Sequence, residues 1–447
     1  MVSKMVKVIT YGSYDLLHHG HIRLLERAKA LGDYLIVGVT SDDFDKTRGK
    51  INVQQSLEER VAAVQATGIP DKVIIEEYEG QKIDDIRRYN VDIFTVGSDW
   101  IGYFDYLNEY CKVVYLPRTE GVSSSEIRAN ESGIKLGLVG YSSFLNKFYK
   151  ESKYVNAIKT IGLCSSDVSK LKDVTDEVEF VTDSIDELLE RVDAVYIHSH
   201  PQFHYEQCKK AILAGKHVLC ESPIAKTEKQ CNELIELAEK NQCVLMEAIR
   251  TAYLTAYSRL LLLLKAGKIG RVVSVDATCT SLSLYDNFGD NSLKWGALEA
   301  WGPTAMLPVF QILGTDYEEA NLFSVENDEF SSVDGFTKLN FMYKHATASI
   351  KVGMSVKAES DLIVSGTKGF AYVPSPWWKT DYFELRYENA SDNKRYFYQV
   401  DGEGIRYELV HLTSAIRDGR PDYYIDRRIT RCISKTIEET SCRIIRG

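Results

Sequence analysis

Two stretches of the chain alternate short apolar runs with segments of helical periodicity. Between Val6 and Leu116 the apolar runs include VKVITYG, YLIVGVT and VDIFTVGS, and the segments between them include HIRLLERAKAL and LEERVAAVQAT. Strands and helices in this order form βαβ units, whose strands lie parallel in one sheet. The pattern restarts at Lys135 and continues to CVLMEAIRT, so we predict a second doubly wound domain.

After Gly270 the pattern changes to long strands of alternating apolar and polar residues, such as RVVSVDATCTSLSL and ATASIKVGMSV. Such alternation is typical of a mostly antiparallel sheet with one buried face. From Tyr407 to about Arg446 the periodicity is helical, and we expect these helices to pack back on the second unit. We therefore predict an α/β protein with a Rossmann-like domain at 1–131, a second Rossmann domain at 132–252 and an open-sheet α+β domain at 253–447.

The 447-residue chain has a net charge of −10, which argues against a nucleic-acid partner, because phosphate backbones bind basic faces. Its nine cysteines include no Cys-x-x-Cys pair, so we expect reduced thiols rather than a disulfide framework or a thiolate zinc site. No apolar run is long enough to span a bilayer, and the first residues lack a signal-peptide core. We expect a soluble cytoplasmic protein without membrane insertion.

Three histidines stand in four positions directly before the first helical segment, in the stretch YDLLHHGHIRLLERAKAL. Gly12 ends the preceding strand and Gly20 lies where the helix begins, so we expect His18 and His21 at or beside a helix N-terminus. Unpaired backbone N–H groups and the positive end of the helix dipole favour an anion there, typically a phosphate. The alternative interpretation is that these are ordinary surface histidines with local hydrogen-bond partners.

Basic side chains stand in two polar stretches further along the chain. DKTRGK carries Lys46, Arg48 and Lys50. PRTEGVSSSEIR places Arg118 among hydroxyls, before a helix expected to start at Ser124 or Ser125. In an acidic protein such residues are candidate ligands of a triphosphate, although a run of charge by itself is usually a solvated face.

Residues 6–128 resemble the glycerol-3-phosphate cytidylyltransferases of the nucleotidyltransferase superfamily. The HxGH signature is present as His18-His19-Gly20-His21, and RTEGVSSSEI is similar to the second motif of that family. VGSDWIGYFDYL and VVYLPRTEG match as well. The resemblance implies transfer of CMP from CTP to a polyol phosphate, glycerol 3-phosphate above all, with release of pyrophosphate and assistance by Mg²⁺. It also implies that the CDP-polyol supplies a surface polymer such as teichoic acid or capsule.

The same resemblance implies roles for individual residues. His18 and His21 would hold the nucleotide phosphates and stabilise the transition state, and Arg118 would hold the triphosphate. Lys46 would meet the β/γ-phosphates or the acceptor phosphate, and Arg60 would lie at the acceptor site. The other implied nucleotide contacts are Tyr11, Gly12, Ser13, Tyr14, Gly20, Asp99, Trp100, Thr119, Ser123, Ser124 and Ser125. KTRGKINVQQ departs from the family pattern, which leaves the acceptor less defined than CTP.

Four stretches of the second half carry a further resemblance, namely IKLGLVGYSSFLNKF, DAVYIHSHPQFH, AGKHVLCESPIA and LLKAGKIGRVVSV. Through them residues 134–447 resemble the Gfo/Idh/MocA family of NAD(P)-dependent oxidoreductases. Dinucleotide binding requires Gly-x-Gly-x-x-Gly/Ala, because the backbone must approach the pyrophosphate and the helix must pack closely. This chain has Gly140 at the first position, but Ser142 and Leu145 at the second and third.

Catalytic residues implied by that family are also replaced. Its Glu-Lys-Pro is here Glu221-Ser222-Pro223, and a seryl hydroxyl cannot replace a lysine as proton donor at neutral pH. Its Asp and its His or Tyr correspond to Ala300 and Thr304. We therefore expect no NAD(P) at this degenerate cofactor site. The remaining polar candidates, either functional or locally hydrogen-bonded, are His200, His204 and Glu221.

The sequence leaves three functions open. In the first, which we expect, a cytidylyltransferase carries a catalytically silent oxidoreductase-like half, retained for homo-oligomerisation through the C-terminal sheet or for binding some ligand. In the second, both halves are active, and the oxidoreductase produces or consumes the polyol. In the third, the chain is a nucleotide-sensing or scaffolding protein, and the intact HxGH and RTEG motifs argue against this.

Overall fold

The computed structural model describes residues 5–41, 53, 55–77, 81–117, 133–155, 157–282, 295–326, 333–354, 356–398, 400, 402–419 and 424–441. The chain divides into two compact units, residues 1–132 and 133–447. Each unit is described by itself.

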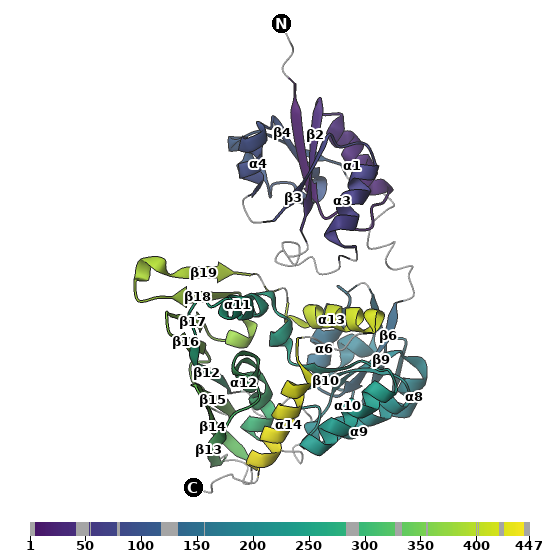
Figure 1. The fold of residues 1–447 in the computed structure, drawn as a ribbon. Helices are drawn as coiled ribbons and strands as arrows, with labels where there is room; N and C mark the ends of the chain where they lie inside the picture. The colour runs from purple at the N-terminus through teal and green to yellow at the C-terminus, as the bar shows by residue number, and fades with distance from the viewer. Residues whose placement is uncertain are drawn as a thin grey trace. The chain divides into compact units, whose positions relative to one another are not determined.

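The first unit is a five-stranded sheet covered by helices (Figure 1). All its strands are parallel and their order is β3-β2-β1-β4-β5, which confirms the predicted βαβ arrangement. Its elements are β1 (Lys7–Gly12), α1 (His19–Lys29), β2 (Tyr34–Thr40), α3 (Leu57–Ala66), β3 (Lys72–Glu76), α4 (Gln81–Tyr89), β4 (Ile93–Gly97), η1 (Ser98–Trp100), η2 (Asp105–Glu109) and β5 (Lys112–Leu116).

Alternate residues of the central strand β1 enter two separate cores. Val8 packs with Leu25 of α1 and Val64 of α3, whereas Ile9 packs with Ile86 of α4. This division follows from the two-residue period of a strand, whose successive side chains point to opposite faces. Figure 1 accordingly shows α1 and α3 on one face of the sheet and α4 on the other.

The second unit begins with a six-stranded parallel sheet of order β11-β10-β9-β6-β7-β8. This is a doubly wound order. Successive strands are added on one side of β6 up to β8 and then on its other side from β9 onward, so the strand order reverses between β6 and β9. Its elements are β6 (Ile134–Gly140), α6 (Phe144–Ser152), β7 (Ile158–Cys164), α7 (Lys172–Thr175), β8 (Phe180–Thr182), α8 (Ile185–Arg191), β9 (Ala194–His198), α9 (Pro201–Leu213), β10 (His217–Glu221), α10 (Glu228–Lys240), β11 (Leu245–Ala248), η3 (Arg250–Tyr253) and α11 (Thr255–Lys265).

An eight-stranded sheet of order β13-β14-β15-β12-β16-β17-β18-β19 follows. The pair β12 and β15 is parallel and the other neighbours are antiparallel, so the sheet is mostly antiparallel, as predicted. Its elements are β12 (Val272–Ser281), α12 (Ala297–Leu313), β13 (Glu319–Glu326), β14 (Asp334–Tyr343), β15 (Ala346–Met354), β16 (Leu362–Gly366), β17 (Phe370–Val373), η4 (Trp377–Lys379), β18 (Tyr382–Arg386), η5 (Ala390–Asp392) and β19 (Lys394–Phe397).

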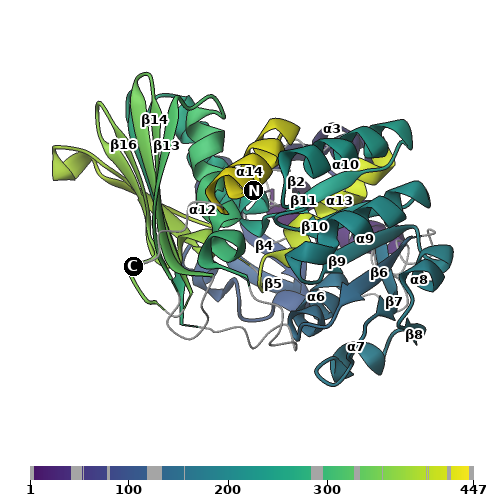
Figure 2. The same ribbon diagram turned by 90° about the horizontal axis from the view of Figure 1, so that it is seen from below.

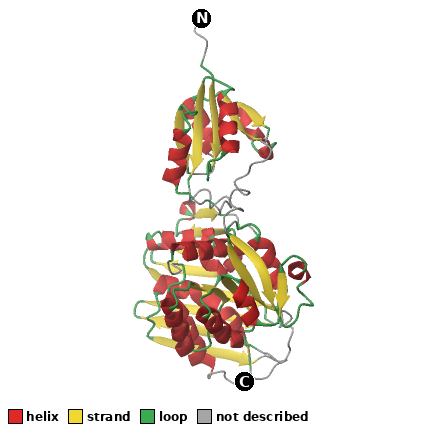
Figure 3. Cartoon of the chain, turned by 90° about the vertical axis from the view of Figure 1, so that its right-hand side faces the viewer, coloured by secondary structure: helices red, strands yellow, loops and turns green. Residues whose placement is uncertain are grey.

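Two C-terminal helices, α13 (Ile405–Asp418) and α14 (Arg427–Ser441), return to the Rossmann part of the second unit. Helix α13 contacts α6 and η3, and α14 contacts both α10 and α12. Figure 2 shows α12 and α14 between the large sheet and the parallel sheet, and Figure 3 shows the helices and strands of the second unit in separate colours. The C-terminal helices thus pack against other elements of this unit. Among the described residues, no helix combines the length and apolarity required to cross a membrane.

Candidate functional site

The loop between β1 and α1 carries the histidines and has an unusual backbone. Tyr14 and Leu16 adopt φ angles of 52° and 49°. Residues with a Cβ seldom occupy this left-handed region, where each costs of order 1–3 kcal/mol and persists only when its surroundings hold it. The loop is therefore strained immediately before His18.

Contacts from the start of α3 hold this loop. The Leu16 N–H donates to Gln55 Oε1 at 2.8 Å, and the Gln55 N–H donates to Asp15 Oδ1 at 3.0 Å. Arg60 is fully buried, and its guanidinium donates to the carbonyls of Ser13, Thr40 and Gln55 at 2.7, 2.9 and 3.1 Å. The Arg60 side chain is thus attached, through Ser13, to the backbone of the loop that precedes His18. Its contact with the acceptor stays a prediction.

His18 is the N-cap of α1, and its Nδ1 accepts a hydrogen bond from the Gly20 N–H at 3.1 Å. Because Nδ1 uses its lone pair there, a neutral His18 carries its proton on Nε2. The His18 and His21 rings stack with centroids 3.9 Å apart and planes inclined by 19°, and Tyr14 meets His21 edge-on at 5.6 Å. The predicted position of both histidines at a helix N-terminus is confirmed.

The charges of α1 leave its N-terminus suited to an anion. Its first turn contains no acidic residue, whereas Arg27 and Lys29 stand in the last turn. An acidic side chain near the first turn would compete with a bound anion for the positive end of the helix dipole. The stacked imidazoles thus adjoin an N-terminus whose first helical turn supplies no acidic counter-charge.

A small cavity opens at the carboxyl edge of the first sheet. Its lining residues are Tyr11, Gly12, Thr40, Lys82, Phe94, Val96, Trp100 and Phe104. The carboxyl ends of parallel strands are the usual location of ligands in α/β folds. Three residues expected at the nucleotide, Tyr11, Gly12 and Trp100, therefore line one cavity in the same unit as the histidines.

Among the cavity residues that sequence reasoning missed, Lys82 is the charged one. It is 7% exposed, contacts the Glu76 carboxylate and lies 4.6 Å from the centroid of the Tyr11 ring. In QKIDDIRRY a lysine resembles any solvated helix residue, and only the fold brings it to the sheet edge. Beside it, the Tyr11 hydroxyl donates to Asp85 at 2.9 Å, and burial together with that carboxylate raises the pKa of Tyr11 far above its usual value.

Other residues expected at the site cannot be placed with them. Asp99 belongs to η1, but its side chain is not among those described. The remaining expected residues that lie outside the described parts of the chain are Lys46, Arg48, Lys50, Arg118, Thr119, Ser123, Ser124 and Ser125. Within the described parts, no three His, Cys, Asp or Glu side chains group as a metal site. Mg²⁺ that arrives with a triphosphate needs only one or two protein carboxylates, because phosphate oxygens and waters complete its shell.

The expected cofactor turn of the second unit lies between β6 and α6. Gly140 has φ 139°, and a Cβ there would lie 2.1 Å from the His198 carbonyl oxygen, so only glycine fits. Ser142 is fully buried and its Oγ accepts from the Phe144 N–H at 3.2 Å. A seryl oxygen thus occupies an N–H group at the start of α6 that a dinucleotide pyrophosphate would use.

Side chains also fill the space above the strand reversal. The Phe144 ring stacks on His198 with centroids 4.9 Å apart, and the Arg250 guanidinium lies 4.8 Å from the centroid of the Phe144 ring. His198 is the last residue of β9 and pairs with Gly140 of β6. The stack therefore stands at the point where dinucleotides enter a doubly wound sheet.

Glu221 joins this cluster. It accepts from the Tyr196 hydroxyl and lies 3.5 Å from His198 Nδ1. Burial by itself raises the pKa of this carboxyl, but His198, Arg250 and the Tyr196 hydroxyl outweigh it and lower the pKa below its usual range. Next to it, the Ser222 hydroxyl donates to the buried Glu247.

The other histidine candidates take part in local hydrogen bonds. His204 is 1% exposed, and its ring nitrogens lie 2.8 and 2.9 Å from the carbonyls of Pro223 and Ser199. It ties together the loops that follow β10 and β9, and burial lowers its pKa. His200 is the N-cap of α9 and accepts from the Gln202 N–H at 3.3 Å. Ala300 and Thr304 lie on α12.

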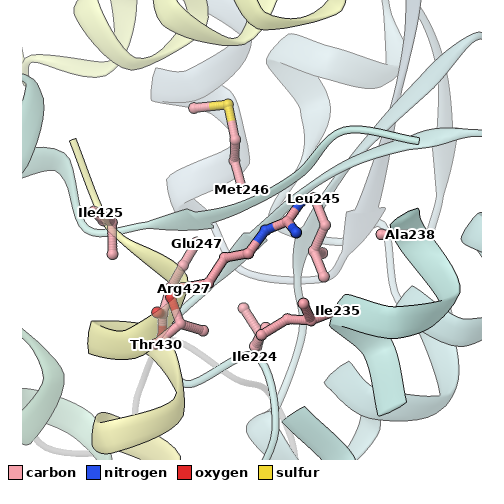
Figure 4. Close-up of a pocket in the computed structure, with 9 residues that line it drawn as sticks. All are labelled: Ile224, Ile235, Ala238, Leu245, Met246, Glu247, Ile425, Arg427 and Thr430. Carbon is pink, nitrogen blue, oxygen red and sulfur yellow. The ribbon is translucent and has the colours of Figure 1, made fainter. Parts of the chain in front are cut away.

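A second cavity, shown in Figure 4, lies where α14 packs on α10 and β11. Its lining residues are Ile224, Ile235, Ala238, Leu245, Met246, Glu247, Ile425, Arg427 and Thr430. Arg427 extends across it and contacts the Glu239 carboxylate, and Glu247 accepts from Ser222. Because both charged groups have partners from the packed elements, we assign this cavity to the packing of α14.

Comparison with known proteins gives a different result for each unit. Residues 9–130 match the family described as cytidylyltransferase-like, and residues 134–249 match the oxidoreductase family with an NAD-binding Rossmann fold. Glycerol-3-phosphate cytidylyltransferase of Bacillus spizizenii is 47% identical over 130 residues, which cover 29% of this chain and 100% of that protein.

Relatives of the second unit are more distant. The scyllo-inositol 2-dehydrogenase (NADP(+)) IolU of Bacillus subtilis is 35% identical over 153 residues, 32% of this chain and 45% of that protein. KijD10, a 3-ketoreductase from Actinomadura kijaniata solved with TDP-benzene and NADP, has a TM-score of 0.60 at 19% identity. That match covers 70% of this chain and 98% of KijD10, and it shows the fold alone.

The full-length match at high identity, the parallel sheet and the histidine N-cap all concern the first unit. Through that unit the chain belongs to the glycerol-3-phosphate cytidylyltransferases, a family of nucleotidyltransferases, and its C-terminal part carries a Gfo/Idh/MocA-type oxidoreductase domain.

Proposed function

We propose that the chain transfers CMP from CTP to a small polyol phosphate, with glycerol 3-phosphate as the acceptor, and releases pyrophosphate. The observation that carries the proposal is the stacked pair His18 and His21 at an α1 N-terminus whose first turn has no acidic residue. Such a site matches a nucleotide triphosphate, because backbone N–H groups, the helix dipole and two imidazoles all favour negative charge.

The reaction proposed is an in-line displacement at the α-phosphorus of CTP. A phosphate oxygen of the acceptor forms a bond to this phosphorus. The bond between the α-phosphorus and the oxygen that bridges to the β-phosphate breaks, and its electron pair leaves with pyrophosphate. Charge builds on the oxygens around the α-phosphorus, and we propose that the His18 side chain, whose Nδ1 caps α1, donates through Nε2 to stabilise it. Mg²⁺ bound to the triphosphate would neutralise charge on the leaving group.

Although the resemblance places Tyr11, Gly12 and Trp100 at the nucleotide, we propose that the cavity they line takes the acceptor phosphate, because Lys82 brings a buried ammonium to it. Lys82 supplies its ammonium, and Tyr11 and Trp100 supply apolar walls. An anion that entered would compete with Glu76 for Lys82, which favours a dianionic phosphate over a weaker ligand. Lys46 and Arg118 remain proposed ligands of the triphosphate.

For the second unit we propose a role without NAD(P) chemistry. Ser142 and Leu145 replace the two small residues of the dinucleotide turn, and Phe144, His198 and Arg250 fill the space at the strand reversal. These side chains do not fit a dinucleotide, since pyrophosphate and nicotinamide would have to displace them. We propose that the domain, with its eight-stranded sheet, instead supports homo-oligomerisation.

The deciding experiment incubates the full chain with CTP, Mg²⁺ and a panel of phosphorylated polyols and measures pyrophosphate release. We expect release with glycerol 3-phosphate, and a His21→Ala variant about 100-fold slower through loss of a transition-state donor. His19→Ala is the matched control, because His19 is the exposed neighbour in the same turn and should leave turnover unchanged. Absence of release with every acceptor would refute the proposal.

A further inference from the structure

We infer that Gln55 and Arg60 form a positioning clamp that presets the histidine loop for phosphate transfer. Neither residue needs to touch substrate for this role. The inference rests on the proposed cytidylyltransferase function, but it concerns a different property, namely how the strained backbone before His18 is kept in place.

The strain requires an external restraint. Tyr14 and Leu16 both occupy the left-handed region, and Leu16 stands two residues before His18. A residue with a Cβ returns to negative φ when nothing opposes it. Relaxation at Leu16 would redirect the chain that leads into His18, so the restraint on Leu16 controls where the imidazole stands.

Gln55 supplies the restraint at Leu16. Its side-chain oxygen accepts the Leu16 N–H at 2.8 Å, while its own N–H donates to Asp15 Oδ1 at 3.0 Å. In the first bond the histidine loop donates and Gln55 accepts. In the second bond Gln55 donates and the loop accepts. Together they fix both the position and the rotation of the peptide unit between Asp15 and Leu16.

Arg60 anchors Gln55 in turn. Its Nε donates to the Gln55 carbonyl at 3.1 Å, and its Nη1 donates to the carbonyls of Ser13 at 2.7 Å and Thr40 at 2.9 Å. The guanidinium therefore links the histidine loop, the end of β2 and the residue before the α3 N-cap. Its planar group of N–H donors suits this linkage, which a lysine cannot reproduce.

The capping box of α3 makes the anchor stiff. The Ser56 N–H donates to Glu59 Oε2 at 2.8 Å, and the Glu59 N–H donates to Ser56 Oγ at 3.3 Å. A capping box fixes the start of a helix, so the position of Gln55 is set by α3 rather than by the loop it restrains. The clamp thus transmits the rigidity of a helix to the catalytic loop.

The test removes the acceptor that the Gln55 side chain offers to the Leu16 N–H. Gln55→Met keeps the length of the side chain but loses the acceptor for the Leu16 N–H, whereas Gln55→His keeps a neutral acceptor. Gln65→Met is the matched control, because Gln65 is an exposed glutamine on α3, the helix that Gln55 precedes. We expect Gln55→Met to lower kcat at least about tenfold with the KM for CTP changed less than about threefold, since misplacement of reacting groups affects the transition state most.

Gln55→His should recover most of kcat, and Gln65→Met should equal the wild type. A normal kcat in Gln55→Met, or an equal loss in Gln55→His, overturns the clamp. Hydrogen exchange at the Leu16 amide gives a readout that does not depend on turnover. We expect at least about tenfold faster exchange in Gln55→Met than in the wild type, and unchanged protection overturns the inference even if the proposed reaction itself fails.

Discussion

We assign His18 one observed and one proposed function, which substitution can separate. Its Nδ1 caps α1 by accepting the Gly20 N–H at 3.1 Å, and we propose that Nε2 is the donor to phosphate. His18→Asn keeps an N-cap acceptor, since asparagine is among the preferred N-cap residues, but removes the Nε2 donor. His18→Ala removes both. The pair of variants therefore distinguishes loss of the cap from loss of the transition-state donor.

The expected magnitudes differ enough to be read separately. Loss of the cap in His18→Ala should cost about 1 kcal/mol of unfolding free energy, while His18→Asn should stay within a few tenths of the wild type. Loss of a preorganised donor should lower kcat by about 10²–10³-fold in both variants. Pyrophosphate release gives kcat, and chemical denaturation gives the unfolding free energy. A His18→Asn variant with wild-type kcat would refute the donor role. If His18→Ala were slow in that case, its loss of kcat would be assigned to the lost cap.

Three further predictions test the other sites. Lys82→Met should raise the KM for the acceptor at least about tenfold and leave the KM for CTP nearly unchanged, because the variant loses the ammonium at the proposed acceptor phosphate; equal effects on both KM values would contradict this. Calorimetry should detect no NADPH binding to the full chain, and micromolar affinity would revive the bifunctional enzyme. The lowered pKa of Glu221 stabilises the fold above its ordinary value near 4.5 and loses this contribution as the pH falls through the folded value. Glu221→Gln should accordingly lose less stability than the wild type on acidification from pH 6 to 3 in urea denaturation, and parallel losses would argue against the assigned shift.

Local patterns predicted much of the first unit because their causes are local. Successive side chains of VKVITYG point into two different cores, and HIRLLERAKAL places its apolar residues on one helical face. Strand β1 and helix α1 therefore follow from the residues themselves. Gly20, which directly follows His19, indicated the helix start, and the structure places the N-cap at His18. What a pattern could not reveal is the strain at Tyr14 and Leu16, since the restraints come from outside the loop.

The missed parts of the site depend on contacts between distant residues. Gln55 meets a loop 39 residues earlier, and Arg60 reaches back 47 residues to Ser13. Lys82 reaches the cavity because β1 and β4 are neighbours in the sheet, which periodicity does not specify. In the second unit the substitutions at Ser142 and Leu145 were visible in the sequence. The stack of Phe144 on His198 was not, because it joins residues 54 positions apart that only the pairing of β6 with β9 brings together.

The two parallel sheets of this chain show why fold alone does not assign activity. Both place the first strand beside the fourth, so both offer a ligand position at the carboxyl edge next to a helix N-terminus. In the first unit the N-cap of that helix is His18, whose Nδ1 accepts the Gly20 N–H. In the second unit a buried seryl oxygen occupies the helix start and an aromatic stack stands over the strand reversal. We therefore propose phosphate chemistry at the first site and internal packing at the second, with the side chains around each helix start deciding between them.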